Sequence, residues 1–149
     1  MCWMPHSTVA TIVERAGRFL MVEELSGGQV VINQPAGHLE ENELFADAAL
    51  RETMEETRWQ VKLKHLVGLY AYKSSTNQAT YHRLCYAAEA IEHHPSEPLD
   101  DGIIQALWLS RDEIAARKDQ LRSPMVLKCI DDYLAGKNYP LDFVYEYLD

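Results

Sequence analysis

The chain has 149 residues, of which 47% are hydrophobic and 25% are charged, and its formal net charge is −9. This length and composition predict one globular domain, residues 1–149, and exclude a disordered or fibrous chain. The acidic charge excludes a typical nucleic-acid-binding protein, but a metal cation or a few local arginines would still allow action on phosphates.

The first part of the chain has the pattern of three strands. Residues 7–14 and 18–25 are rich in β-branched and bulky apolar residues and flank a short turn with a glycine, which predicts a hairpin. Residues 29–34 predict another short strand, which Pro35 and Gly37 end. A loop is therefore expected before the first helix.

Residues 44–57 predict that helix, because they contain no glycine or proline and repeat small and apolar residues at helical spacing. The side expected to face the core carries Ala46, Ala49, Leu50, Thr53, Met54 and Thr57. Strand patterns return at 66–72 and 81–90, joined by a polar segment, and indicate a second hairpin.

The last part of the chain predicts a loop, a strand and two helices. Residues 93–102 hold two prolines and a glycine, typical of a surface loop, and 103–109 form the next strand pattern. Ser110 and Glu113 have the spacing of a capping box that starts a short helix. For the final helix, the sequence predicts Ser123 as N-cap, Pro124 as first residue and an end at Gly136. The order of elements predicts an α/β or α+β domain with a mixed sheet flanked by helices.

The cysteines and the apolar segments further restrict the kind of protein that this chain can be. Cys2, Cys85 and Cys129 are odd in number and far apart, which argues against a zinc knuckle or a disulfide framework. No apolar run approaches the length of a membrane span, and the first residues lack the pattern of a secretion signal. We therefore predict a cytoplasmic protein that does not bind membranes.

Three glutamates of the first helix suggest a functional site. Glu52, Glu55 and Glu56 stand at positions i, i+3 and i+4, so their carboxylates share one helix face. One interpretation is an ordinary solvated face, because glutamate is a good helix former. The other is a site for a hard cation such as Mg²⁺, which prefers oxygen ligands. No histidine shares this face, which disfavours zinc.

The stretch around these glutamates resembles a known family. "GHLEENELFADAALRETMEETRW", residues 37–59, resembles the Nudix box, G-x5-E-x7-R-E-U-x-E-E-x-G-U, where U is a bulky apolar residue. The fixed positions that match are Gly37, Glu43, Arg51, Glu52, Glu55 and Glu56. The segments 33–40, 121–126 and 139–141 are similar to the NudJ-type phosphatase branch of this family.

The resemblance implies a fold and an activity. The fold is the Nudix α/β/α sandwich, with a mixed β-sheet and a catalytic loop-helix-loop. The activity is Mg²⁺-dependent hydrolysis, with Mn²⁺ possible, that releases orthophosphate from nucleoside di- and triphosphates and from hydroxymethylpyrimidine diphosphate. Two alternatives stay open: a pyrophosphohydrolase acting on another nucleoside diphosphate derivative, and a non-catalytic module that senses a nucleotide. The expected partner is a small phosphorylated molecule, and the chain is expected to be a monomer or a homodimer.

The resemblance also implies residue roles. The metal ligands are Gly37, through its carbonyl, and Glu52, Glu55 and Glu56, and the catalytic residues are Arg51, Glu52 and Glu55. Arg51 is expected to pair with Glu55 or with Glu43 and to hold the carboxylates in place. The candidate proton acceptors are Glu55 and the loop residues Glu97, Asp100 and Asp101.

The expected substrate contacts are Gln34, His38, Tyr72, Arg83 and Arg122. Arg83 is a charge in a predicted strand, so it could bind a phosphate or form a salt bridge within the fold. Tyr72 could stack on a base, and Arg122 precedes a helix start, where anions bind readily.

Two positions depart from the box. Thr53 stands where a bulky apolar residue is usual, and its hydroxyl is expected to bond the carbonyl of Ala49. Arg58 replaces the glycine that follows the helix, so the sequence predicts either a strained left-handed arginine or a different exit from the helix.

Overall fold

The computed structural model describes residues 2–149 and places seven strands in one mixed sheet. The strands are β1 (His6–Arg15), β2 (Arg18–Ser26), β3 (Gln29–Asn33), β4 (Ala36–His38), β5 (Trp59–Lys73), β6 (Thr80–His93) and β7 (Ile103–Ser110). The helices are α1 (Phe45–Thr57), α2 (Arg111–Ala116) and α3 (Met125–Leu134), with short 3-10 turns η1 (Lys118–Gln120) and η2 (Leu141–Phe143). The predicted strands and helices are all present, and the second hairpin is longer than predicted.

The strand order is β3-β2-β1-β6-β5, with β4 paired to β1 and β7 paired to β2. β1 runs parallel to β6, and the other pairs are antiparallel. A parallel pair needs a long crossover, and α1 lies in the connection between β1 and β6. The sheet is therefore mixed, as the order of elements predicted.

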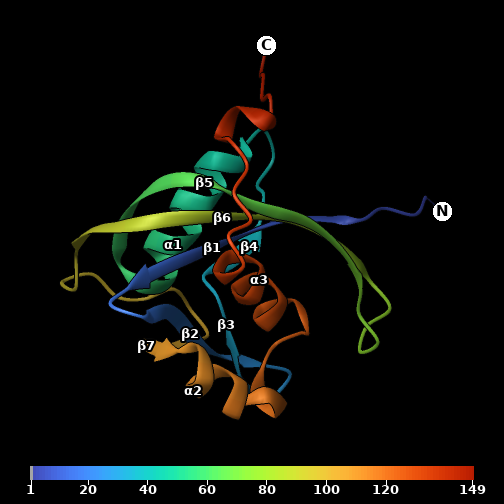
Figure 1. The fold of residues 1–149 in the computed structure, drawn as a ribbon. Helices are drawn as coiled ribbons and strands as arrows, with labels where there is room; N and C mark the ends of the chain where they lie inside the picture. The colour runs from blue at the N-terminus through green and yellow to red at the C-terminus, as the bar shows by residue number, and fades with distance from the viewer. Residues whose placement is uncertain (1) are drawn as a thin grey trace.

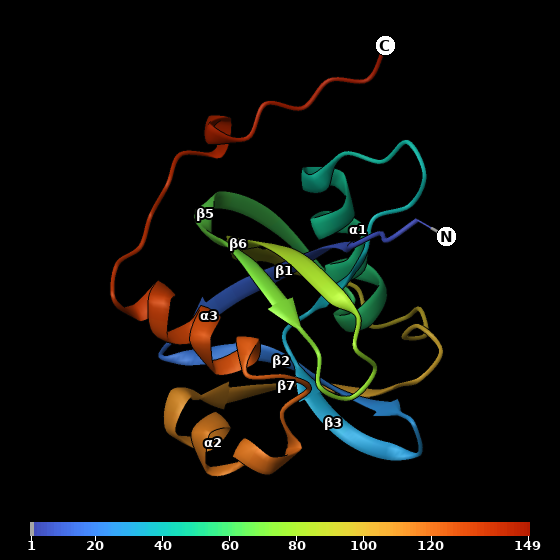
Figure 2. The same ribbon diagram turned by 90° about the vertical axis from the view of Figure 1, so that its right-hand side faces the viewer.

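Helices cover both faces of the sheet (Figures 1 and 2). Because successive strand residues point to opposite faces, Val9 of β1 packs in a cluster with Ala48 and Ala49 of α1. Its neighbour Ala10 packs in the other main cluster, with Val126 of α3. This arrangement confirms the predicted α/β/α sandwich.

The core-facing side of α1 differs from the prediction at Leu50 and also includes Ala48 and Glu56, which were not predicted on it. Leu50 is 37% exposed, whereas Glu56 is buried. The helix presents small residues to the sheet, and small side chains give a weak apolar stripe from which the rotation of a helix is hard to read. Thr53 lies in this interface, and its hydroxyl donates to the carbonyl of Ala49 at 2.8 Å, as predicted.

The predicted capping box of α2 is present, whereas α3 has Pro124 and not Ser123 at its N-cap position. Ser110 and Glu113 form the reciprocal capping box at the start of α2. The hydroxyl of Ser123 accepts from the N–H of Met125 at 3.1 Å, although α3 begins one residue later than predicted. Gly136 has φ of 86° just after α3, a conformation that glycine adopts freely.

The cysteines and the helices of residues 2–149 bear on the disulfide and membrane predictions. The three cysteines in this range are free thiols. None of the helices in this range has the length and apolar character of a membrane span.

Candidate functional site

The backbone at Gly37, just before the loop that leads into α1, lies very close to the helix. Gly37 lies in β4, which pairs with β1. A Cβ atom at this position would lie 2.3 Å from the carboxyl carbon of Glu52, far inside van der Waals contact. Only glycine therefore lets the backbone of this loop approach the Glu52 carboxylate so closely.

Arg51 braces the same loop. Its Nε donates to Glu43 Oε2 at 2.7 Å and its Nη2 donates to Glu43 Oε1 at 2.9 Å, a two-point contact. Nη2 also donates to the carbonyl of His38 at 3.1 Å, and Nη1 donates to Glu52 at 2.9 Å. The hydrogen bond to Glu43 raises the pKa of Arg51, and that bond lowers the pKa of Glu43.

The two pairings predicted for Arg51 are both present, with different strengths. The contact with Glu43 is short, whereas the nearer Glu55 oxygen lies 3.4 Å from Arg51 Nη1. Arg51 therefore ties the helix to its preceding loop and bonds Glu55 more weakly.

Glu56 is a buried carboxylate. Its side chain accepts from the N–H of Ala36 at 2.9 Å, and the residue is 7% exposed. In the part of the chain that the structure describes, no ion pair includes Glu56. Burial raises the pKa of Glu56 to about 9. Burial also raises the pKa of Glu52, against the opposing effect of Arg51.

The predicted metal ligands lie near one another but do not meet at one point. Over residues 2–149 no three side chains of metal-binding type converge closely enough to hold an ion as they stand. Glu52 and Glu55 turn toward Arg51, and Glu56 turns toward Ala36. The donor set still fits a hard cation, because buried carboxylates need a positive partner and all the side-chain ligands are oxygens.

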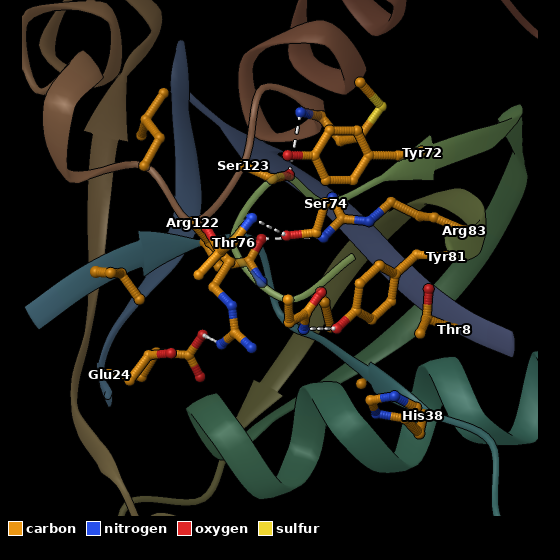
Figure 3. Close-up of a pocket in the computed structure, with 18 of the residues that line it drawn as sticks. Thr8, Glu24, His38, Tyr72, Ser74, Thr76, Tyr81, Arg83, Arg122 and Ser123 are labelled. Carbon is orange, nitrogen blue, oxygen red and sulfur yellow. Dashed lines mark hydrogen bonds and ion pairs between the residues drawn. The ribbon is translucent and has the colours of Figure 1, made fainter. Parts of the chain in front are cut away.

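A pocket of about 480 Å³ opens beside this loop (Figure 3). Four predicted substrate contacts line it, namely His38, Tyr72, Arg83 and Arg122. Figure 3 shows Tyr72, Tyr81 and Arg83 on one side and Arg122 with Glu24 on the other. Gly37 also lines the pocket, so the pocket and the loop beside Glu52 are continuous.

Arg83 has a guanidinium held by neutral amides. It is 8% exposed, Nη1 donates to Gln34 Oε1 at 2.9 Å, and Nη2 donates to Asn33 Oδ1 at 3.2 Å. No salt bridge joins Arg83 to a carboxylate anywhere in residues 2–149. Of its two predicted alternatives, the internal salt bridge is therefore not formed.

Gln34 is not on the pocket wall, which corrects its prediction as a direct contact. It is fully buried, and its Nε2 donates to the carbonyl of Val126 at 2.5 Å while its Oε1 accepts from Arg83. The side chain is occupied by bonds within the fold. Gln34 orients Arg83 instead of facing the pocket.

His38 and Arg122 both have partners. The rings of His38 and His6 bond through Nε2 and Nδ1 at 2.9 Å. Burial lowers the pKa of His38, and His6 adds to the effect. Arg122 donates to Glu24 at 2.8 Å, so its charge is already matched by a carboxylate.

Sequence reasoning missed Glu24 and Asn33. Glu24 has a side chain only 15% exposed, and it follows an irregularity between Glu23 and Glu24 in the β2–β7 pairing. Such a bulge shifts which residues face the pocket and is not readable from alternation. Asn33 ends β3, and its polar side chain next to a buried strand was the available signal.

The loop carboxylates differ in position. The N–H of Asp100 donates to the carbonyl of Glu55 at 2.9 Å, which places Asp100 beside the end of α1. Glu97 pairs with Arg58 at 3.1 Å. Asp101 is exposed in the same loop. Asp100 is therefore the loop candidate that the backbone fixes to the helix.

Arg58 has the left-handed conformation predicted for a strained exit, with φ of 61° and ψ of 19°. Its Nε donates to the carbonyl of Pro98 at 2.8 Å, and its carbonyl accepts from the N–H of His94 at 2.7 Å. These bonds fasten the loop 94–102 to the end of α1. The bond from His94 is made by the backbone, but the side-chain bond to Pro98 is one that a glycine cannot make, and it offsets the backbone strain of the arginine.

Two substitutions at Arg58 distinguish the cost of its left-handed backbone from the contribution of its side-chain contacts. We expect Arg58→Ala to lower the free energy of unfolding more than Arg58→Gly, by about 1 kcal/mol, because alanine keeps a Cβ in the left-handed region. Urea unfolding of both variants and the wild type measures the difference. Equal stability of the two variants would show that no strain resides at this position.

Comparisons with known proteins agree with this geometry. The family model described as NUDIX domain matches residues 4–129. The chain is 37% identical over 140 residues to Phosphatase NudJ of Escherichia coli K12 and of Shigella boydii, covering 94% of this chain and 90% of each relative.

Solved structures show the same relationship. A NUDIX hydrolase from Nitrosomonas europaea has 41% identity and a TM-score of 0.95, covering 97% of this chain and 98% of that one. A UDP-X diphosphatase has a TM-score of 0.74 at 14% identity, covering 95% of this chain and 69% of that one, and shows the fold alone. The chain therefore belongs to the NUDIX family and is a hydrolase, similar to NudJ-type phosphatases.

Proposed function

We propose that this chain hydrolyses the terminal phosphoanhydride bond of nucleoside di- and triphosphates and of hydroxymethylpyrimidine diphosphate, releasing orthophosphate. The observation that carries the proposal is the pocket, which joins Arg83 to the Gly37 loop beside Glu52. A guanidinium held by two neutral amides keeps its charge available for a phosphate. The NudJ-type relatives support orthophosphate release, since they are named phosphatases.

The proposed cofactor is Mg²⁺, with Mn²⁺ as an alternative. Glu52, Glu55, Glu56 and the carbonyl of Gly37 would hold it. Two features support this assignment: among residues 2–149 Glu56 is buried without a cationic partner, and Gly37 leaves no room for a side chain between its backbone and Glu52. When bound, such an ion polarises phosphoryl oxygens and makes water a better nucleophile.

Four further side chains, those of Arg51, Arg83, Tyr72 and Glu55, have proposed tasks. Arg51 keeps Glu52 in place through its brace to Glu43. Arg83 orients the phosphate, and Tyr72 stacks against the base or pyrimidine ring. Glu55, the half-exposed carboxylate of the helix face, accepts the proton of the attacking water, with Asp100 as the second candidate.

A panel of substrates tests the reaction. Nucleoside di- and triphosphates and hydroxymethylpyrimidine diphosphate are incubated with the enzyme and Mg²⁺, and orthophosphate and diphosphate are measured separately. We expect orthophosphate as the product. Release of diphosphate would favour the pyrophosphohydrolase alternative. Binding without turnover of any substrate would favour the nucleotide-sensing module.

The oligomeric state can be tested on the same protein. We propose a monomer or a homodimer that acts on small phosphorylated molecules and not on nucleic acids, in keeping with the net charge of −9. Light scattering under assay conditions measures the mass. A mass above twice 17.1 kDa would contradict the proposal.

The raised pKa of Glu56 predicts a pH dependence of stability. Between the ordinary value of 4.5 and about 9, the folded state keeps a proton that the unfolded state has released. Stability without metal should therefore fall as pH rises through this window, with a slope of up to about 1.4 kcal/mol per pH unit. Unfolding measured in a chelator from pH 5 to pH 9 checks the slope, and Glu56→Gln should flatten it.

Added Mg²⁺ should offset the loss of folding stability that is expected as the pH rises. The ion binds the deprotonated carboxylate, so the rise in melting temperature that it produces should be larger at pH 8.5 than at pH 6. A rise independent of pH in the wild type would contradict the assignment of Glu56 as a ligand.

A further inference from the structure

The helix that carries the site glutamates begins without a cap of its own. Leu44 occupies the N-cap position in an extended conformation and makes no side-chain cap. The first N–H groups of a helix have no partner within the helix. Here the N–H of Phe45 donates to Glu146 Oε1, and the N–H of Ala46 donates to Glu146 Oε2 at 3.2 Å. A carboxylate 101 residues beyond Phe45 therefore caps α1.

The segment that supplies this carboxylate is anchored on both sides of η2. Tyr139 and Leu66 exchange two backbone hydrogen bonds, of 2.8 and 2.9 Å. Val144 packs against the cluster that includes Ala48 of α1. Both ribbon views show the C-terminal segment leaving α3 and passing the start of α1 (Figures 1 and 2). Glu146 therefore reaches the helix from a segment that is itself fixed.

The capped turn leads directly to the site. Glu43, two residues before α1, receives the two-point contact from Arg51, and Arg51 holds Glu52. If the first turn of α1 frays, the position of Glu43 relative to Arg51 is lost. Loss of the cap at Phe45 would therefore also change the position of the Glu52 carboxylate, two turns further along α1.

We propose that Glu146 is a positioning residue for the hydrolase site: its carboxylate fixes the start of α1 and, through Glu43 and Arg51, the orientation of Glu52. A negative charge at a helix N-terminus adds favourable interaction with the helix dipole. The consequence for metal binding rests on the proposed function, whereas the consequence for the helix start does not. The two are measured separately.

Hydrogen exchange of the full chain tests the cap itself. In Glu146→Ala, the amides of Phe45 and Ala46 should exchange about fivefold faster, the factor expected for loss of a typical cap, while the amides of α3 keep their rates. Asp142→Ala removes a carboxylate from an exposed position in the same segment and serves as the control. It should leave the exchange at α1 unchanged.

A local cap provides the rescue. Adding Leu44→Ser to Glu146→Ala places a serine hydroxyl at the N-cap position, where it can accept from the N–H of Ala46, the second residue of α1, and should restore slow exchange at Ala46 without the tail carboxylate. In the kinetic assay, Glu146→Ala should raise the Mg²⁺ concentration at half-maximal rate about fivefold and leave kcat at saturating Mg²⁺ within twofold. The double variant should recover the wild-type Mg²⁺ dependence.

Three results would overturn the proposal. They are unchanged exchange at Phe45 and Ala46 in Glu146→Ala, faster exchange at Ala46 that Leu44→Ser does not reverse, and an Mg²⁺ dependence of Glu146→Ala equal to that of the wild type. If the wild type turns over no substrate, the proposed function fails, and the exchange pattern still decides whether Glu146 fixes the helix start.

Discussion

Glu56→Gln is expected to lower kcat by about a hundredfold to a thousandfold while the protein stays folded. Removing a ligand of a catalytic cation forfeits several kcal/mol of transition-state stabilisation, and each 1.36 kcal/mol is a factor of ten in rate. Glutamine has the same shape and still accepts from the N–H of Ala36, so the packing around position 56 is kept.

The free energy of unfolding of Glu56→Gln should be higher than that of the wild type, although its kcat is lower. Glu56 is 7% exposed, so at pH 8 without metal the folded protein keeps it protonated, and its ionisation on unfolding favours the unfolded state. Glutamine removes that ionisation, so at pH 8 in a chelator the variant should unfold at a higher urea concentration than the wild type. Loss of activity together with gain of stability is typical of a residue kept for chemistry and not for folding.

Asp47→Asn is the matched control for this experiment. Asp47 lies on the exposed side of α1, so the change removes one carboxylate from the same helix. We expect its kcat to stay within twofold of the wild type. If Glu56→Gln retains wild-type turnover at saturating Mg²⁺, Glu56 is not a ligand and the proposed site is wrong.

The features that the sequence predicted correctly depend on neighbouring residues. The capping box at Ser110 and the bond from Thr53 to the carbonyl of Ala49 both follow from positions within four residues of one another, and the left-handed Arg58 is one of the two exits from the helix that the sequence left open. Local geometry restricts these conformations before any tertiary contact forms. The helix-borne contact between Arg51 and Glu55 belongs to the same class.

The features that the sequence did not predict depend on contacts between distant segments. The rotation of α1 was misread at Leu50 because the helix packs through small residues, whose burial has little apolar signal. Glu24 enters the pocket through an irregular strand pairing, and Glu146 reaches α1 from the end of the chain. A residue pattern within one segment carries no information about such partners.

Gln34 illustrates the same limit within the site. Its position beside the glycine loop predicted a substrate contact, yet the side chain points into the fold and bonds Arg83. In the structure, Gln34 supports a side chain that lines the pocket and does not line the pocket itself. Telling a substrate contact from a supporting residue requires knowing the hydrogen-bond partner of Gln34, which is Arg83, 49 residues away in the sequence.

Arg83→Gln is expected to lower kcat/KM by about a hundredfold, mainly through a higher KM. A hydrogen bond to a charged group contributes about 1.5 to 3 kcal/mol, and losing a phosphate contact of this kind corresponds to a factor of about 10 to 150. Steady-state kinetics on the best substrate of the panel measures the change. Arg122→Gln should cost less than tenfold, because Arg122 already pairs with Glu24.

Asn33→Asp tests the same point without removing the guanidinium. Arg83 donates to Asn33 Oδ1 at 3.2 Å, so a carboxylate at that position would neutralise the charge that the amide leaves available. We expect kcat/KM to fall at least tenfold although Arg83 is still present, and higher pH should not restore it, because the new carboxylate is ionised throughout the assay range. If both Asn33→Asp and Arg83→Gln keep kcat/KM within threefold of the wild type, the phosphate binds elsewhere. In that case the amides of Gln34 and Asn33 hold Arg83 for the fold alone.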